Sequence, residues 1–295
     1  MESKLNDIKI LKNEPLSHYT FTKTGGPAEL LAFPKNVKEL EMLVQLANKD
    51  RLPITVIGRA SNLIIRDGGI HGLVISLIHL NRIRCVGNQI IADAGAAIID
   101  ASICAQKHSL SGLEFAAGIP GSVGGAIFMN AGAYGGSTDS IVDSVNVLSD
   151  GKIQTLNRDQ LNFGYRHSII QDQKMVVLSA TFNLKPADSN QIQSFMDHIN
   201  ALRMSKQPLE LPSCGSVFKR PTGYFTGKLI HDAHLQGYRS GGAEVSKKHA
   251  GFIVNVDHAT ADDYLNVIHH VQSVVYEQNQ VKLHPEVRII GNRNK

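Results

Sequence analysis

The sequence predicts a mixed α and β fold arranged in about three blocks. Apolar residues recur at helical spacing in several segments, such as Val37 to Ala47, and this period is typical of amphipathic helices. Between these segments lie short runs rich in β-branched residues, such as Ile54–Ile57, bounded by glycine, proline and polar residues as strands usually are. No internal repeat or low-complexity segment interrupts the pattern, and a length of 295 residues predicts two or three domains.

The first block alternates helices and strands. Asn36 is a suitable N-cap for a helix that begins at Val37. Pro53 opens the strand Ile54–Ile57, which ends at the polar loop 58–62. The further elements expected before residue 118 are strands at 63–66, 72–76 and 89–93 and a helix at 96–109.

The rest of the chain is first rich in strands and then in helices. Strands are expected at 141–148, 153–156 and 176–184, with the turn Asp150-Gly151 between the first two. Residues 186–190 indicate a domain boundary or the entry to a helix with one apolar face (Ile192, Met196, Ile199, Leu202). Thr260 and Asp263 form a capping box that begins a last helix, whose apolar stripe comprises Tyr264, Leu265, Ile268, Val271 and Val275.

The composition is that of an ordinary soluble protein, with 42% hydrophobic and 19% charged residues. No signal peptide and no membrane span are expected, because no apolar run is long enough. The three cysteines are odd in number and far apart, which predicts reduced thiols in the cytoplasm. The net charge of +4 includes no long basic block, so we expect no nucleic-acid partner.

The most informative segment runs from Gly118 to Gly136, where seven of nineteen residues are glycine and none is charged. A flexible linker would be more polar, and glycine is unfavourable inside an ordinary helix or strand. Such a segment indicates a loop whose backbone lies close to a flat or anionic ligand, with N–H groups directed toward it. The alternative is a tight turn between two buried elements.

Several common motifs are absent. The glycines at 118–124 have the spacing Gly-x-x-Gly-x-x-Gly, which is not the Rossmann fingerprint. Residues 223–229 resemble a P-loop, but the loop is one residue short and Leu229 replaces the hydroxyl residue that binds magnesium. The thirteen histidines lack metal-ligand spacing, so no metal site is expected, and no serine-hydrolase elbow is present.

Four further segments point to an anionic substrate or cofactor. The loop Gly58–Asn62 follows a strand, where backbone N–H groups can bind phosphate. Arg166 lies in a polar turn, where its guanidinium can hold a carboxylate. Ser216 stands beside two cations in 213–221, and Glu286 offers a carboxylate just before a strand. Each residue alone is more typical of a turn or a structural ion pair, but together they favour one site.

These segments, in this order, resemble the UDP-N-acetylenolpyruvoylglucosamine reductase family. The matching motifs are Thr-Lys-Thr-Gly-Gly-Pro at 22–27, the loop 58–62, the run 118–136, Tyr-Arg-x-Ser at 165–168, Gly-Ser-x-Phe at 215–218, Gly-Lys-Leu-Ile at 227–230, His-Ala-Gly-Phe at 249–252 and Pro-Glu-Val-Arg at 285–288. The resemblance extends from about Thr20 to Gly291, which is nearly the whole chain.

The resemblance implies an α+β fold of the vanillyl-alcohol-oxidase (PCMH) type. Two FAD-binding subdomains are expected at 1–77 and 78–188, followed by an α+β substrate-binding domain at 200–295. It also implies noncovalent FAD, with NADPH as co-substrate and UDP-N-acetylglucosamine enolpyruvate as substrate. The product is UDP-N-acetylmuramate, a peptidoglycan precursor. A cytoplasmic monomer is expected.

The resemblance also assigns residues to roles. Arg166, Ser216 and Glu286 are the catalytic candidates: Arg166 would stabilise developing negative charge, Ser216 would donate a proton, and Glu286 would polarise the site or hold the enol form if its pKa were raised. The candidates for binding UDP and carboxylate groups are Tyr165, Lys219, Arg220, Lys228, His249 and Arg288. The candidates for binding FAD are Gly58, Arg59, Ala60, Ser61, Asn62, Leu63, Gly118, Ile119, Pro120, Gly121, Ser122, Gly124, Gly125, Ala126, Asn130, Gly132, Ala133 and Tyr134.

Some residues depart from the family pattern. Arg59-Ala60 replaces a small residue and glycine, and alanine reaches positive φ less easily than glycine does. Ser168–Gln171 runs straight into the next strand, as in a shorter subtype without an inserted tyrosine loop. His71 is interpreted as a turn residue rather than as a covalent flavin ligand.

Two alternative functions stay open at this stage. The first is an FAD oxidase of the same fold acting on an alcohol or hydroxy acid, which would have a covalent histidine or a catalytic tyrosine. The second is an inactive protein that binds the uridine-linked sugar, which would lack one of the three catalytic candidates.

Overall fold

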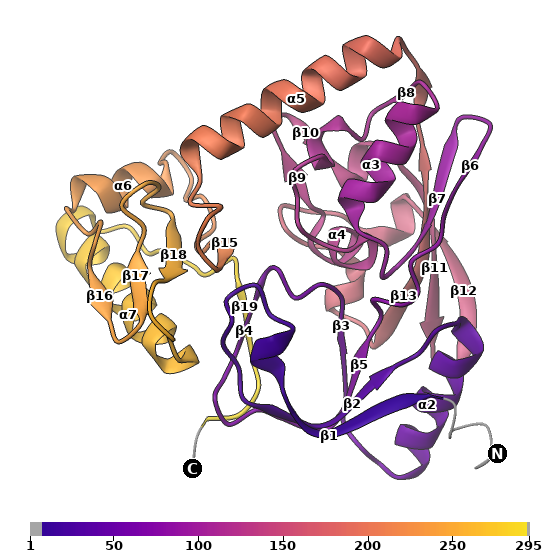
Figure 1. The fold of residues 1–295 in the computed structure, drawn as a ribbon, viewed down its shortest axis with the longest axis horizontal. Coiled ribbons are helices and arrows are strands. Elements are labelled where there is room, and N and C mark those ends of the chain that lie inside the picture. Colours follow the sequence, from indigo (N-terminus) through magenta and orange to yellow (C-terminus); the bar gives the residue numbers. More distant parts are fainter. Residues whose placement is uncertain (1–7, 294–295) are drawn as a thin grey trace. The chain divides into compact units, whose positions relative to one another are not determined.

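The computed structural model describes residues 8–293, and the chain divides into two compact units. Of the described residues, 8–11, 30–59 and 72–202 belong to the first unit, and 12–29, 60–71 and 203–293 to the second. Each unit has its own cluster of buried apolar side chains. The mixture of helices and strands in Figure 1 confirms the predicted α+β class.

One sheet, most of which lies in the first unit, has four strands in the order β1 (Lys9–Pro15), β2 (Pro27–Phe33), β5 (Ile70–Ser76) and β3 (Ile54–Ile57). The strands β3 and β5 are parallel. Helix α2 (Val37–Lys49) begins as predicted, since the Asn36 side chain accepts a hydrogen bond from the Glu39 N–H. Its Leu40 and Leu43 are fully buried in the core of this unit. A short 3₁₀ turn, η1 (Leu16–His18), follows β1.

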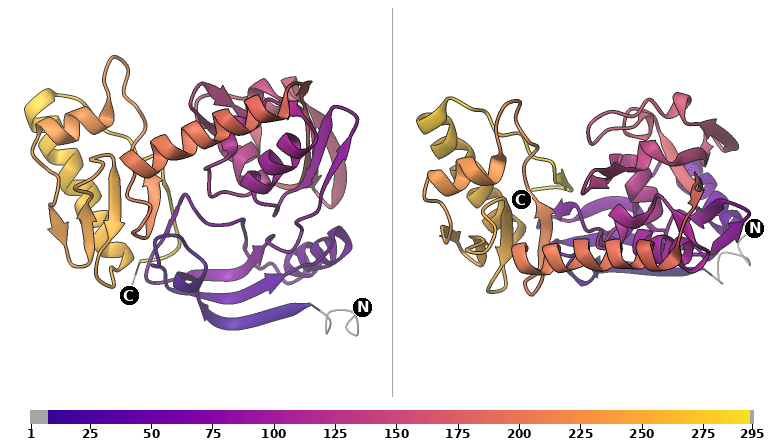
Figure 2. Two further views of the ribbon diagram at one scale, coloured as in Figure 1. Left: turned by 45° about the horizontal axis from the view of Figure 1, so that its top comes forward. Right: turned by 90° about the horizontal axis from the view of Figure 1, so that it is seen from above.

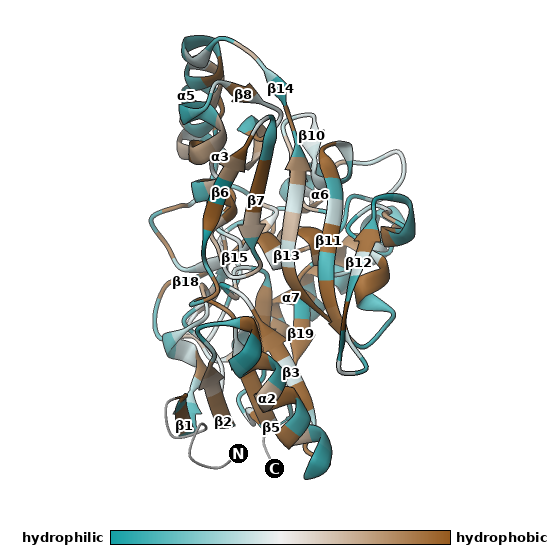
Figure 3. Ribbon diagram, turned by 90° about the vertical axis from the view of Figure 1, so that its right-hand side faces the viewer, coloured by the Kyte–Doolittle hydropathy of each residue, from teal (hydrophilic) through white to brown (hydrophobic). Residues whose placement is uncertain are grey.

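The larger sheet of the first unit is antiparallel throughout. Its order is β12 (Lys152–Asn157), β11 (Val142–Ser149), β13 (Met175–Asn183), β7 (Gln89–Asp93) and β6 (Ile83–Val86). Helices α3 (Ile98–Lys107) and α4 (Val123–Met129) pack against one face (Figure 1). Figure 3 shows the five strands side by side on the other face, where the Asn146 amide donates to Ser179 Oγ and accepts from Thr155 Oγ1. The alternation of buried and polar positions along β11 explains this two-sided character.

Smaller elements complete this unit. Strand β8 (Leu110–Ser111) pairs with β14 (Lys185–Pro186), and β9 (Gly132–Ala133) pairs with β10 (Gly136–Ser137). Helix α5 (Ser189–Lys206), most of which lies in this unit, is long and uninterrupted in both views of Figure 2 and buries Ile192, Met196 and Ile199. The single-turn 3₁₀ helices are η2 (Glu114–Ala116), η3 (Thr138–Ser140), η4 (Asp159–Leu161) and η5 (Ile169–Gln171).

The second unit contains an antiparallel sheet with two helices. The strand order is β15 (Ser213–Ser216), β18 (Phe252–Asn255), β17 (Ala243–Val245) and β16 (Arg239–Ser240). The helices are α6 (Thr226–Asp232) and α7 (Ala261–Asn279), and the predicted capping box of α7 is present. A separate parallel pair joins β4 (Leu63–Ile65) to β19 (Arg288–Ile290).

Most local predictions are confirmed, and three are wrong. The glycine-rich run is not a continuous loop, because it contains α4, whose N-cap Ser122 accepts from the Gly125 N–H. His71 lies in β5 rather than in a turn, and its side chain is exposed, with Nδ1 3.7 Å from Glu29 Oε2. Ser168–Gln171 does not run straight into a strand: it forms η5, which precedes β13 by three residues. Within residues 8–293, none of the helices combines the length and the apolar character needed to cross a membrane.

Candidate functional site

The loop 58–62, which follows β3, has a strained backbone at the position where alanine replaces the glycine of the family motif. Ala60 adopts φ +50°, in the left-handed region where glycine is preferred. The backbone N–H groups of residues 58–62 donate to no acceptor in the part of the chain that the structure describes. Gly58 lies so close to Ser122 that a Cβ at this position would overlap Ser122 Oγ. The loop and the start of α4 are therefore in contact through Gly58.

The N-terminal end of α4 uses some of its N–H groups and leaves others available. The N–H groups of Val123 and Gly124 donate to the carbonyls of Ala96 and Ala94, and that of Gly125 donates to Ser122 Oγ. By contrast, the N–H groups of Gly121 and Ser122 have no acceptor within residues 8–293. Any anion bound here would therefore meet the N–H groups before the helix rather than those inside it.

Apart from Ala126, the remaining cofactor candidates lie at or beyond the two ends of α4. Asn130 ends the helix in the left-handed conformation with φ +41°. Tyr134 and Gly135, both at positive φ, form the two-residue turn between β9 and β10. Tyr134 is exposed, whereas a Cβ on Gly136 would be 2.7 Å from the Phe115 ring. Gly118, Ile119 and Pro120 lie between η2 and α4, and Ala126 is buried within α4.

Arg166 lies in a two-residue turn closed by backbone hydrogen bonds between Gly164 and His167. It adopts φ +54°, which is unusual for a residue with a long side chain. Its guanidinium donates to the carbonyl oxygens of Gly132, at 3.0 Å, and Asn130, at 3.5 Å. The Tyr165 side chain is 58% exposed, and its ring centroid lies 5.3 Å from the Arg166 guanidinium carbon.

Three side chains attach this turn to the C-terminal end of α4. The Asn130 amide donates to the Gly164 carbonyl at 2.9 Å. Ser168 Oγ donates to the Phe128 carbonyl at 2.9 Å. The Gln171 amide donates to the same carbonyl at 2.7 Å and to the Arg166 carbonyl at 3.0 Å. Phe128 and Asn130 thus have carbonyl groups at the helix end that accept from the Arg166 segment.

In the second unit, a backbone irregularity positions Ser216. Ser213 pairs with Val254 and Ser216 with Phe252, so the register shifts between them. Gly215 has φ +77° at this shift, a conformation that glycine adopts without strain. Ser216 is therefore at the end of β15 with an exposed side chain.

The Glu286 segment lies beside the Ser216 segment. The Glu286 N–H donates to the Val217 carbonyl at 2.7 Å, and Phe218 forms an isolated antiparallel β-bridge with Pro285. Asn62 also joins this group, because its side-chain amide donates to the Glu286 carbonyl at 3.3 Å. Its own carbonyl accepts from the Arg288 N–H at 3.0 Å. Three of the predicted segments, which are far apart in the sequence, are therefore neighbours.

His249 also lies near Ser216, within the same unit. Its Nδ1 accepts a hydrogen bond from the Gly251 N–H at 3.1 Å, so the ring proton of the neutral form is on Nε2. A Cβ on Gly251 would be 3.2 Å from His249 Cε1 and 3.4 Å from Ser216 Oγ. Burial lowers the pKa of the His249 imidazole, which favours this neutral form.

The cationic candidates differ in their local partners. Lys228 Nζ lies 2.7 Å from Asp232 Oδ2, and the pKa of that carboxyl is lowered chiefly by the hydrogen bond from Lys228. The Arg220 guanidinium carbon lies 3.9 Å from the Phe225 ring centroid. The Lys219 N–H donates to the His284 carbonyl, which places Lys219 in the Glu286 group.

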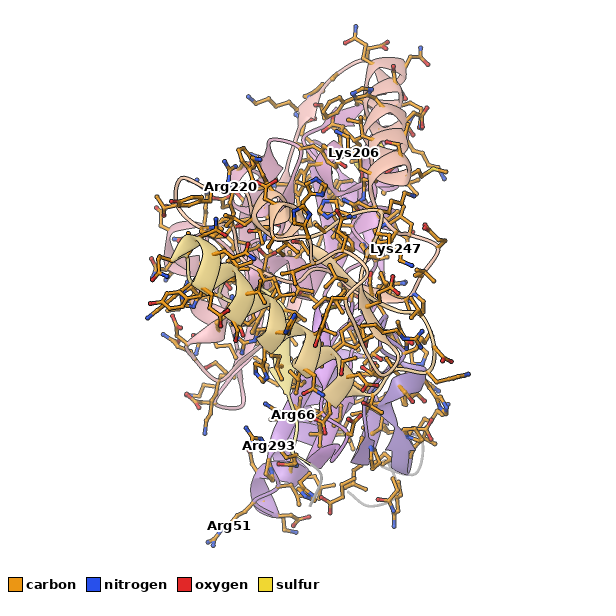
Figure 4. All side chains as sticks on the ribbon, turned by 90° about the vertical axis from the view of Figure 1, so that its left-hand side faces the viewer. Arg51, Arg66, Lys206, Arg220, Lys247 and Arg293 are labelled. Carbon is orange, nitrogen blue, oxygen red and sulfur yellow. The ribbon has the colours of Figure 1, made fainter. Side chains whose placement is uncertain are left out.

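Figure 4 shows that basic residues are spread over the second unit. Arg220 and Lys247 lie well away from Arg66 and Arg293 in this view. The Arg66 N–H donates to the Ile290 carbonyl, so Arg66 lies beside the C-terminal strand. The labelled basic residues of this unit therefore do not form one continuous patch.

The predicted residues fall into two groups, which belong to different units. The first group comprises the start of α4, Gly58 and the Arg166 turn; the second comprises Asn62, Ser216, His249 and the Glu286 segment. Sequence reasoning missed Gln171, because an amide in a polar turn carries no signal beyond its position five residues after Arg166. It also missed the contact of Asn62 with the Glu286 carbonyl, which depends on the pairing of β4 with β19.

Comparisons with known proteins agree on one family. The family described as FAD binding domain matches residues 28–157, and the C-terminal domain of UDP-N-acetylenolpyruvoylglucosamine reductase matches residues 207–290. The reductase of Lactiplantibacillus plantarum is 64% identical over 285 residues, covering 96% of this chain and 94% of that protein. The reductase of Levilactobacillus brevis is 62% identical with the same coverage.

A solved structure agrees with these relatives. The UDP-N-acetylenolpyruvylglucosamine reductase of Thermus caldophilus superimposes with a TM-score of 0.84 at 31% identity, covering 96% of this chain and 98% of that one. Similarity therefore extends over nearly the full length of both the sequence and the fold. The chain belongs to the UDP-N-acetylenolpyruvoylglucosamine reductase family.

Proposed function

We propose that this protein reduces UDP-N-acetylglucosamine enolpyruvate to UDP-N-acetylmuramate with NADPH, using noncovalently bound FAD. The observation that carries the proposal is the 64% identity to a reductase over 96% of this chain. The reaction adds a hydride and a proton across a carbon–carbon double bond, so the protein must bind an anionic substrate and supply the proton. The product, UDP-N-acetylmuramate, is a precursor of peptidoglycan.

The residues around Gly58 and Ser122 fit the FAD pyrophosphate. Backbone N–H groups without acceptors among residues 8–293 occur on both sides of this contact, at 58–59 and at 121–122, all within the first unit. Such groups bind phosphate oxygens without any charged side chain. A Cβ at Gly58 would overlap Ser122, so glycine lets the two segments lie this close together. When bound, FAD would supply the hydride, and NADPH would reduce the flavin again.

Ser216 is proposed to donate the proton to the carbon next to the substrate carboxylate. A serine hydroxyl is a weak acid, but the strongly basic enolate that it meets lowers the demand, and Lys219 can assist. The exposed position of Ser216 at the end of β15 leaves the hydroxyl accessible. Its neighbour Glu286 would polarise the site.

Arg166 is proposed to bind the substrate carboxylate and stabilise charge that develops on it. A guanidinium keeps its charge at any working pH and matches a carboxylate with two parallel N–H donors. The substrate candidates are Tyr165, Lys219, Arg220, Lys228, His249 and Arg288. A monomeric state, a cytoplasmic location and the domain boundaries 1–77, 78–188 and 200–295 stay predictions.

The test has two stages. Purified protein is expected to show flavin absorption bands, and FAD released by denaturation should be close to one per chain. In stopped-flow experiments, Ser216→Ala should keep flavin reduction by NADPH and lose at least about 100-fold in flavin reoxidation by the enolpyruvyl substrate. Ser213→Ala, at the other end of the same strand, serves as the matched control and should leave both steps near wild type.

The outcomes separate this proposal from its rivals. Intact half-reactions in Ser216→Ala would refute the proton-donor role. Oxidation of an alcohol or hydroxy acid with oxygen, without reaction of the enolpyruvyl substrate, would favour a flavin oxidase. Tight binding of the uridine-linked sugar without flavin or turnover would favour a binding protein.

A further inference from the structure

Arg166 has a strained backbone that must be held in place by its surroundings. Its φ of +54° lies in a region that long side chains rarely adopt, and such strain persists only where neighbouring contacts fix it. Two backbone hydrogen bonds between Gly164 and His167 close the turn of Tyr165 and Arg166. The orientation of the guanidinium thus depends on groups outside the turn.

The Gln171 side chain contacts the Arg166 backbone directly. Its amide nitrogen has two protons, and carbonyl oxygens lie at 3.0 Å (Arg166) and 2.7 Å (Phe128). It therefore ties the carbonyl of the strained residue to the end of α4. The Arg166 guanidinium contacts the residues just beyond the same helix end, at the carbonyls of Asn130 and Gly132. The backbone and the side chain of Arg166 are thus both held by hydrogen bonds at the C-terminal end of α4.

We propose that Gln171 is a positioning residue for Arg166 in substrate reduction. This inference rests on the proposed function, in which Arg166 binds the substrate carboxylate. Gln171 itself is not expected to touch the substrate, because the two N–H groups of its amide are directed at protein carbonyls. Its effect on the reaction must therefore pass through Arg166.

A double-mutant cycle tests this dependence. Gln171→Met keeps the length of the side chain and removes both donors. In wild-type background it should lower kcat/KM for the enolpyruvyl substrate about 10- to 100-fold, the usual effect of misplacing a binding group by a fraction of an ångström to one ångström. In an Arg166→Met background the same change should cost less than about 3-fold, measured as single-turnover flavin reoxidation.

Two further measurements distinguish positioning from a general loss of structure. Gln173→Met is the matched control, because Gln173 is an exposed glutamine two residues away. It should leave kcat/KM unchanged. The thermal midpoint should fall by the same amount when Gln171→Met is made in either background, since the Phe128 contact is lost in both. The affinity for UDP-N-acetylmuramate should fall only where Arg166 is present.

Two kinetic results would contradict a positioning role for Gln171. Equal kinetic losses in both backgrounds would show that Gln171 acts independently of Arg166, and an unchanged kcat/KM in Gln171→Met would overturn the proposal. If Gln171→Met fails to fold, Gln171→Asn keeps the amide but cannot reach both carbonyls, and the same cycle applies. Failure of the wild-type protein to reduce the enolpyruvyl substrate would instead refute the proposed function.

Discussion

Ala60 carries a backbone cost that glycine would not. It adopts φ +50° and is buried, at the point where the family motif has glycine. Alanine in the left-handed region costs about 1 kcal/mol. Ala60→Gly should therefore raise the free energy of unfolding by about 1 kcal/mol, measured by urea denaturation at matched FAD occupancy.

Ala187→Gly is the control for that substitution. Ala187 has a negative φ and is partly buried, so glycine there brings the entropic cost of a more flexible unfolded chain and loses the packing of one methyl group. It should lower the free energy of unfolding by about 0.5–1 kcal/mol. If both substitutions destabilise the protein equally, the strain at Ala60 is not real.

His249 should make stability depend on pH. Burial lowers its pKa in the folded state, so between the folded and unfolded pKa values the unfolded chain binds more protons. Stability is then complete above the unfolded pKa of about 6.5 and falls as the pH drops through the folded value. Protonation of Nδ1 would also remove the acceptor of the Gly251 N–H.

The measurement compares wild type with His249→Gln from pH 7.5 to pH 5 by urea denaturation. The wild-type protein should lose more stability than the variant over this range. Direct titration of the imidazole by NMR should give a value below that of a model peptide. A value above it would contradict the burial argument.

At the scale of elements, α7 shows how one helix end is fixed from a distant segment. Asp67 accepts hydrogen bonds from the Ala261 and Asp262 N–H groups, at 3.0 Å each, beside the capping box of Thr260 and Asp263. These N–H groups have no partner within the helix, and the helix dipole favours a negative charge there. Asp67→Ala should lower the free energy of unfolding by about 1–3 kcal/mol.

Asp67→Asn is the informative control for the same site. Asparagine keeps one acceptor oxygen but neither the charge nor the second acceptor, so its loss should be intermediate. Thermal and urea denaturation of the three proteins give the order directly. An Asn variant as stable as wild type would show that the charge contributes nothing.

Elements with local signals could be predicted from the sequence. Asn36 before α2, the run Ile54–Ile57, and the capping box of α7 each carry their information within a few residues. Helix α4 could not, because Gly124 and Gly125 disfavour a helix locally. A Cβ on Gly124 would be 3.0 Å from the Ala94 Cβ, so close packing within the unit explains the glycine.

The same distinction applies to the site. Residue types such as Arg166, Ser216 and Glu286 were found because motifs carry them. Their surroundings depend on contacts between distant segments, such as Gln171 with Phe128, 43 residues apart. The pairing of Val217 with Glu286 likewise depends on how the second unit folds. No local pattern contains that information.

At the scale of the whole molecule, the second unit is discontinuous in sequence. Its core includes Ile64 of β4, which is fully buried. Strand β4 pairs with β19, Asp67 caps α7, and the Thr22 carbonyl accepts from the Asn255 amide at 3.0 Å. All these N-terminal contributions are missing from the predicted domain 200–295.

That fragment should therefore not fold cooperatively by itself. Burial of Ile64 contributes about 1.5–3 kcal/mol and the Asp67 contacts about 1–3 kcal/mol, against a total stability of roughly 5–15 kcal/mol for a whole domain. Residues 200–295 alone should show a broad thermal transition and poorly dispersed amide NMR signals, whereas the full chain should show a sharp one. An excess of a synthetic peptide covering 60–71 should raise the midpoint, because it restores β4 and Asp67. A fragment that unfolds in one sharp transition without the peptide would show that 200–295 is an autonomous domain after all.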